Sequence, residues 1–256
     1  MNRKVEGVAE DLSGRIAGWD VVDTVTIAET AEGDPNDPYF FLSLDVYSRG
    51  DIPDVETRMR LFSDAGAFES SSVTAKDRFL VEEIPVRVEY KDISRIDEIL
   101  RKTSDNTWVF RQTGTYMFYR LAEARRLVSK SDWLESVRES LQSLPNEFWF
   151  RITAASRATM EHYLGDLIAA VVRDDVLFYL ISSAGFIKSF LSLLFVLNRR
   201  FEPSGRMLYE MVWGLPELPE NFKGRFESFL RDDPEFPASR KRELAELLAK
   251  SVVLMS

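Results

Sequence analysis

The sequence predicts an α+β fold, in which a mixed sheet with flanking helices precedes an all-helical bundle. Two observations support this prediction. Residues 40–46 and 85–91 alternate apolar and polar side chains, a period of two that is typical of strands. Beyond residue 103, apolar side chains instead recur at helical spacing almost to the end of the chain. We therefore expect a sheet domain over residues 1–103 and a helical domain over residues 104–256.

The first domain is expected to open with a helix over residues 3–17 and a strand over residues 21–28, followed by a turn rich in proline. The strand at 40–46 comes next. The remaining elements are, in order, a helix that begins at Pro53-Asp54 and stops before Gly66, a strand at 79–81, the strand at 85–91, and a helix capped by Asp92 that runs to Leu100. This order predicts a sheet covered by helices.

The second domain is expected to consist of helices alone. They are predicted near residues 107–129, 131–143, 146–173, 175–199, 204–214, 219–231 and 238–254. The run over 176–197 is long enough to cross a bilayer. Lys188 in its middle, four serines and the lack of a second such run favour a buried central helix, and we expect no membrane partner.

The 256-residue chain has the composition of an ordinary globular protein, and this composition excludes several kinds of chemistry. It contains no cysteine, so disulfides, thiolate catalysis and cysteine-bound metals are excluded. Its net charge of -9 would repel a polyanion, and we expect no nucleic-acid partner. We interpret His162, the single histidine, as a residue on a helix face. The N-terminus shows no secretory signal, which favours a cytoplasmic location.

Two carboxylates occupy similar places on the two clearest strands. Asp45 shares a strand face with Phe41 and Ser43, and Glu89 shares a face of the other strand with Arg87. If the strands are neighbours, Asp45 and Glu89 meet, and two acids at one point could hold Mg²⁺ for phosphoryl chemistry. The alternative is a half-exposed sheet whose charges are merely solvated.

Three stretches give the chain a resemblance to the nucleotidyltransferase superfamily, most nearly to a bacterial branch of the lincosamide- and kanamycin-type enzymes. They are Asp37-Pro38-Tyr39 with Val46-Tyr47, Gly50 and Pro53; Val86-x-Val88-x-Tyr90-Lys91-Asp92; and Leu194-Phe195-x-Leu197-Asn198-Arg199-Arg200-Phe201-x-Pro203 with Gly205 and Arg206. In that branch the first stretch carries paired aspartates, the second carries a third acid, and a Gly-Ser motif ends the preceding strand. The resemblance implies a sheet that binds Mg²⁺ and transfers a nucleoside monophosphate to a hydroxyl acceptor.

The positions that carry this chemistry differ in the present chain. Alignment without gaps puts Ala28-Glu29 at the Gly-Ser motif, Phe41 and Ser43 at the paired aspartates, and Arg87 at the third acid. Glu29 would bring negative charge toward the phosphates, and Phe41 cannot hold a cation. Asp45 and Glu89 lie two residues beyond the expected acids, a displacement of roughly 6.5–7 Å along a strand. We therefore expect a degenerate site.

These interpretations leave three functions open. In the first, the protein lacks transfer activity and binds a nucleotide, a small molecule or a partner in the cleft between its domains; the candidate contacts are Glu29, Arg87, Lys188, Asn198 and Arg206. In the second, it is an active transferase in which Asp45 and Glu89 hold Mg²⁺ and Ser43 assists. In the third, it is an interaction module that could form a homo-oligomer. The surface of contact would be formed by aromatic residues such as Trp213, Phe222 and Phe226.

Overall fold

The computed structural model describes residues 3–28, 37, 39–71, 75–103, 114–231 and 236–255. The chain forms two compact units. The sheet unit consists of Met1–Lys102 with Phe118–Ser143, and the helical unit consists of Thr103–Met117 with Leu144–Ser256. A sheet with helices in one unit and helices in the other confirm the predicted α+β fold. The division differs from the one expected at residue 103, because Phe118–Ser143 returns to the sheet unit.

A mixed sheet forms the centre of the sheet unit, and the described strands follow the order β3-β4-β5-β2-β1-β6. β2 and β5 are parallel neighbours, and the other neighbouring strands are antiparallel. The strands span Val22–Ile27 (β1), Leu42–Ser48 (β2), Gly66–Ser71 (β3), Lys76–Val81 (β4), Ile84–Asp92 (β5) and Arg125–Ser129 (β6). Strands were predicted at β1, β2, β4 and β5, whereas β3 was not.

β6 lies within residues 107–129, for which the sequence predicts a helix, and this prediction is wrong there. The described part of the segment contains helix α5 (Tyr116–Glu123), followed at once by β6. β6 pairs antiparallel with β1, with Val128 opposite Val25. Two apolar residues, Leu127 and Val128, stand between charged and polar ones, a run too short to distinguish a strand from a helical turn. The partner strand therefore decides the conformation.

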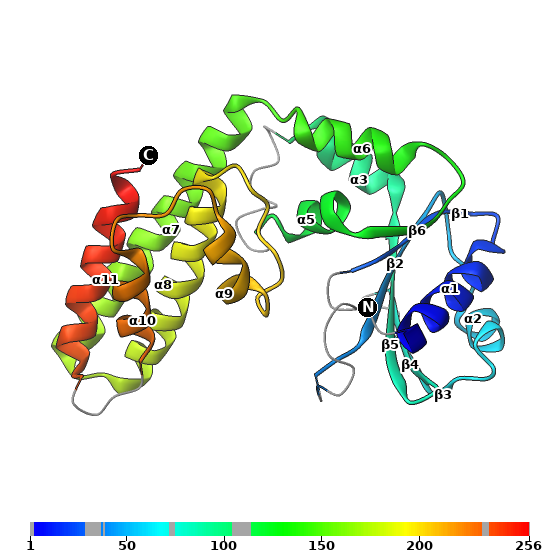
Figure 1. The fold of residues 1–256 in the computed structure, drawn as a ribbon, viewed down its shortest axis with the longest axis horizontal. Helices are drawn as coiled ribbons and strands as arrows, with labels where there is room; N and C mark the ends of the chain where they lie inside the picture. Colours follow the sequence, from blue (N-terminus) through cyan, green and yellow to red (C-terminus); the bar gives the residue numbers. More distant parts are fainter. Residues whose placement is uncertain are drawn as a thin grey trace. The chain divides into compact units, whose positions relative to one another are not determined.

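Helices cover the sheet. α1 (Arg3–Ala17), whose predicted bounds are confirmed, buries Leu12 and Ile16 in one core with Leu44 of β2, and it lies to the right of β2 in Figure 1. β2 is buried along its whole length, so the alternative of a half-exposed sheet does not hold for this strand, whereas β5 alternates buried and partly exposed residues. The other helices among the described residues of this unit are α2 (Val55–Leu61), α3 (Ile93–Arg101), α5 and α6 (Trp133–Gln142).

The helical unit is built around two long helices. They are α7 (Asn146–Arg173) and α8 (Val176–Leu197), and they are followed by α9 (Leu208–Met211), the short 3-10 helix η2 (Val212–Gly214), α10 (Phe222–Leu230) and α11 (Ala238–Val253). The aromatic residues proposed above as an oligomer surface belong to the core instead. Phe222 and Phe226 are buried and stack with ring centroids 5.1 Å apart, and Trp213 packs against them.

α8 is long and apolar enough to cross a membrane by length and composition alone. Half of its most apolar 18-residue stretch is buried in the helical unit, where Phe186, Phe190 and Leu194 pack into the core. The core helix of a soluble protein has these same properties, and the structure is consistent with the predicted central helix. Asp175 caps the start of α8, because its Oδ1 accepts the backbone N–H of Phe178 at 3.0 Å.

Candidate functional site

Asp45 and Glu89 lie directly opposite each other on β2 and β5. Ser43 and Arg87 form the corresponding pair two residues earlier, on the same face of the sheet. The prediction that the two acids meet is therefore confirmed. Both are withdrawn from water: the side chain of Asp45 is fully buried, and that of Glu89 is 14% exposed.

Basic side chains contact both acids. Arg120, from α5, places its Nε 2.6 Å from Asp45 Oδ2 and its Nη1 3.6 Å from Glu89 Oε2. Lys91 Nζ lies 2.8 Å from the same Asp45 oxygen, and Lys76 Nζ lies 3.0 Å from Glu89 Oε1. We call these five residues the ion-pair network. Within it, three positive charges offset two negative ones.

The network shifts the pKa values of two of its members. Burial alone would raise the pKa of Glu89, but the charges of Arg120, Lys91 and Lys76 outweigh burial and hold it below its ordinary value of 4.5. Burial lowers the pKa of Lys91 below its ordinary 10.5, and the pull of Asp45 in the other direction is weaker. Glu89 is thus kept ionised by its neighbours.

Neutral side chains of β2 complete this face of the sheet. Arg120 Nη2 donates a hydrogen bond to Ser43 Oγ at 3.1 Å, and the Tyr47 hydroxyl donates to Asp45 Oδ2 at 3.4 Å. Burial raises the pKa of Tyr47 well above its ordinary value, so it remains a protonated donor. Phe41 lies under the Arg87 guanidinium, 4.1 Å from the ring centroid, a cation–π contact.

This arrangement does not fit a divalent cation. Mg²⁺ needs several oxygen ligands in a nearly octahedral shell. Asp45 Oδ2 and both oxygens of Glu89 already contact cationic groups, and Asp45 Oδ1, which lacks a hydrogen-bond partner, is a single ligand. No group of three or more metal-binding side chains occurs in the described part of the chain. Arg120 and Lys91 would repel a cation from the oxygens that should hold it.

The other predicted site residues that the structure describes, Lys188, Asn198 and Arg206, belong to the helical unit. Glu29 lies outside the described residues. Asn198 caps α8: its Nδ2 donates to the carbonyls of Leu194 and Glu217, and its Oδ1 accepts the N–H of Glu217, so its amide is engaged in the fold. Arg206 is exposed in a turn before α9, which begins at Leu208 rather than directly after Pro203.

His162 is exposed on α7, with Nε2 3.5 Å from Asp166 Oδ2, and this agrees with the predicted position on a helix face. Lys188 lies on α8, within the helical unit, where it lines a cavity.

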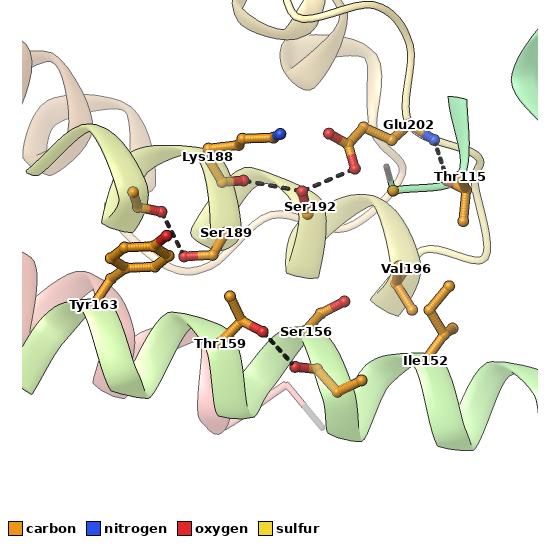
Figure 2. A pocket seen from close by; sticks show the side chains of 13 residues that line it. Thr115, Ile152, Ser156, Thr159, Tyr163, Lys188, Ser189, Ser192, Val196 and Glu202 are labelled. Atoms are coloured by element: carbon orange, nitrogen blue, oxygen red, sulfur yellow. Dashed lines mark hydrogen bonds between the residues drawn. The ribbon is translucent and has the colours of Figure 1, made fainter. Parts of the chain in front are cut away.

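That cavity has a volume of about 330 Å³ and lies entirely within the helical unit (Figure 2). Its lining combines hydroxyl groups, a few apolar groups and two opposite charges: Gly114, Thr115, Ile152, Ala155, Ser156, Thr159, Tyr163, Gly185, Lys188, Ser189, Ser192, Val196 and Glu202. Such a mixture of apolar walls and converging polar groups is typical of small-molecule sites.

Glu202 is the buried acid of this cavity. Its side chain accepts a hydrogen bond from Ser192 Oγ at 2.8 Å, and its backbone N–H donates to Thr115 Oγ1 at 2.7 Å. Burial raises the pKa of Glu202 above its ordinary value, and the Ser192 hydroxyl and the Lys188 charge only partly oppose this. Gly114, at φ +62°, allows the approach of the carboxylate, because a Cβ there would lie 2.6 Å from Glu202 Oε2.

Sequence reasoning missed Arg120 and Glu202. Arg120 falls in a segment that was assigned to the helical domain, so its pairing with Asp45 could not be foreseen. Glu202 stands inside a quoted stretch, between Phe201 and Pro203. A lone acid among apolar and proline residues was an available signal for a buried carboxylate.

Comparison with known proteins gives a family match for part of the chain and a fold for all of it. Residues 117–206 match a family model described as "Domain of unknown function (DUF4037)", a range that includes Arg120, Lys188 and Glu202. None of the curated proteins matches this chain. The structure is similar to the crystal structure of a nucleotidyltransferase-like protein from Exiguobacterium sibiricum, with a TM-score of 0.50 and 13% identity, covering 98% of this chain and 76% of that chain. At this identity the likeness concerns the fold, and the chain therefore has a nucleotidyltransferase-like fold.

Proposed function

We propose that this protein retains the nucleotidyltransferase-like fold without metal-dependent transfer, and that its sheet unit binds an anionic ligand such as a nucleotide in the absence of a metal. The observation that supports this most directly is Arg120, which contacts both Asp45 and Glu89. Its guanidinium stands where a metal bound to these acids would carry its charge. The alternative, an active transferase with Mg²⁺ on the two acids, would require both ion pairs to open first.

Charge favours an anion at this face of the sheet. The ion-pair network contains three basic and two acidic side chains, and Arg87 lies on the same face of the sheet. The side chains of Lys76 and Lys91 are 32% and 21% exposed, so a ligand in solution can reach them. Lysine and arginine are the usual phosphate contacts in proteins. Binding through these residues needs no bridging cation.

Calorimetric titration with ATP, GTP, CTP and UTP tests the binding, in parallel with Mg²⁺ and with EDTA. We expect at least one nucleotide to bind with the same Kd in both conditions. Lys76→Gln should weaken that binding by about tenfold, the loss of one charge-assisted hydrogen bond. Lys102→Gln is the matched control, because Lys102 lies in the same unit and pairs on the exposed surface with Glu98. Absence of binding by all four nucleotides would refute the binding part of the proposal.

Pyrophosphate release with a panel of hydroxyl acceptors tests the loss of transfer. We expect none from the wild-type protein with Mg²⁺ or Mn²⁺. Release that is abolished by Asp45→Ala would instead establish the active transferase. The relation to the lincosamide- and kanamycin-type branch, the cytoplasmic location and a homo-oligomer stay predictions from the sequence.

A further inference from the structure

The cavity of the helical unit presents two opposite charges that do not pair with each other. Glu202 is 6% exposed, whereas Lys188 is exposed at the edge of the cavity. Figure 2 shows the Lys188 ammonium and the Glu202 carboxylate pointing toward one another in the cavity. The Lys188 charge acts on Glu202 and partly opposes the rise that burial causes in its pKa, but the two groups do not approach as a direct ion pair. A ligand that carries both a positive and a negative group would complement both.

The hydroxyl groups of the wall favour a ligand that donates hydrogen bonds. Ser189 Oγ donates to the Gly185 carbonyl at 2.7 Å, and Thr159 Oγ1 donates to the Ala155 carbonyl at 3.0 Å. Ser192 Oγ lies within hydrogen-bond distance of two acceptors, Glu202 Oε2 at 2.8 Å and the Lys188 carbonyl at 3.0 Å. Because each hydroxyl has a single proton, these groups can offer the cavity only their lone pairs. Together with the Glu202 carboxylate these three hydroxyls supply acceptors, which suit an ammonium group, and the hydroxyls of Thr115, Ser156 and Tyr163 also line the cavity.

One end of the cavity is apolar. Ile152 of α7 and Val196 of α8 lie close together there, as Figure 2 shows, and Ala155 also lines it. The volume of about 330 Å³ is near the lower limit of small-molecule sites, which are about 300–1,000 Å³. A ligand of this size has room for a short aliphatic side chain and little more.

We propose that this cavity binds a small aliphatic α-amino acid in its zwitterionic form, with the ammonium group on Glu202 and the carboxylate on Lys188. The site goes beyond the proposed nucleotide-binding function and uses none of the residues of the ion-pair network. Its apolar end receives the side chain of the amino acid.

Calorimetric titration with glycine, alanine, valine, leucine and isoleucine tests the proposal. We expect at least one of the branched amino acids to bind. For valine, the two half-ligands are isobutylamine, which lacks the carboxylate, and 3-methylbutanoate, which lacks the amine. Each should bind at least about tenfold more weakly than valine, since each loses one charge-assisted contact. No binding by any of the five amino acids would overturn the proposal.

Two variants assign the ends of the ligand. Lys188→Met should weaken the binding of valine by about tenfold and leave the binding of isobutylamine unchanged, because the amine does not contact Lys188. Glu202→Gln should weaken the binding of valine and leave the binding of 3-methylbutanoate unchanged. Lys250→Met and Glu227→Gln change the same charges at exposed positions of α11 and α10 and should have no effect.

Either cavity variant behaving like its control would also overturn the proposal. Lys188 is exposed, so Lys188→Met provides a decisive result even if Glu202→Gln fails to fold. Nucleotide binding to the Lys188→Met protein should equal that of the wild type, which separates this site from the proposed function.

Discussion

Arg120 Nε and Asp45 Oδ2 lie 2.6 Å apart, and both side chains are almost completely buried. Asp45 belongs to the central strand β2, and Arg120 belongs to helix α5, which follows a segment of the helical unit in the sequence. The contact therefore joins distant parts of the sequence. Desolvated charges of this kind depend on each other: each is costly to bury unless the other is present.

Replacement of Arg120 by methionine should therefore destabilise the sheet unit. We expect a loss of about 3–5 kcal/mol in the free energy of unfolding, because Asp45 would keep its burial and lose one of the two basic groups at its Oδ2, and Glu89 would lose one as well. Urea denaturation followed by circular dichroism measures this. The matched control is Arg60→Met, since Arg60 pairs with Glu56 on the surface, and this variant should stay within about 0.5 kcal/mol of the wild type. Equal stability of the two variants would contradict the role of Arg120.

Gly185 of α8 should not tolerate alanine. A Cβ at this position would lie 2.4 Å from the Tyr163 ring of α7, so the two helices would have to move apart. We expect Gly185→Ala to cost roughly 1–3 kcal/mol in thermal or urea unfolding. Gly165→Ala is the control on α7, where nothing lies within 4 Å of the added Cβ; alanine there should stabilise the protein by about 0.4–1 kcal/mol. The same sign for both substitutions would show that α7 and α8 are not held this closely.

Glu89 and Glu202 should change stability with pH in opposite directions. The folded pKa of Glu89 lies below its ordinary 4.5, so its ionisation stabilises the fold above pH 4.5, and this contribution is lost as pH falls through the folded pKa. The folded pKa of Glu202 lies above 4.5, so its contribution is complete below pH 4.5 and is lost as pH rises through the folded pKa.

Unfolding free energies of wild type, Glu89→Gln and Glu202→Gln from pH 3 to pH 7 test both directions. Relative to its glutamine variant, the wild type should gain stability with rising pH at position 89 and lose stability at position 202. A stability difference that changes in the same direction with pH at both positions would contradict the opposite pKa shifts of Glu89 and Glu202.

Asp92 and Asp132 both precede helices, but they should differ in importance. Asp92 Oδ1 accepts the Ser94 N–H at 2.8 Å and caps α3, whereas Asp132 makes no side-chain capping bond to α6. Asp92→Ala should cost about 0.5–2 kcal/mol, the value of an N-cap, and Asp132→Ala should stay within about 0.5 kcal/mol. Urea denaturation of the two variants gives the comparison, and a larger loss at Asp132 would contradict it.

The parts of the fold that sequence predicted are those whose signal is local. α1 has apolar residues at helical spacing, and β2 and β5 have a clear period of two, so their positions were confirmed. β3 has no such signal: Gly66–Ser71 contains one large apolar residue, Phe68, among small and polar ones, and it is a strand because it pairs with β4. β6 likewise depends on β1. Conformation in these two segments is set by the neighbour rather than by the segment itself.

The candidate site shows the same limit. The strand pattern placed Asp45 and Glu89 on the polar faces of two strands, and the parallel pairing of β2 with β5 puts the two residues opposite each other. Arg120 and Lys76 could not be assigned to these acids, since pairing between distant segments leaves no periodic trace in the sequence. The predicted residues therefore identified the place, and the basic residues that neutralise it required the structure.

The return of Phe118–Ser143 to the sheet unit has a consequence for how the protein is made. When only the first hundred residues have left the ribosome, the nascent chain contains neither β6 nor Arg120. One edge of β1 then has no strand partner, and Asp45 lacks one of its counter-ions. The sheet is complete only after β6, which ends at Ser129, has emerged, and by then Thr103–Met117 of the helical unit has already been synthesised. A recombinant fragment cut at residue 103 would stay in that incomplete condition and should aggregate, whereas the intact chain avoids it.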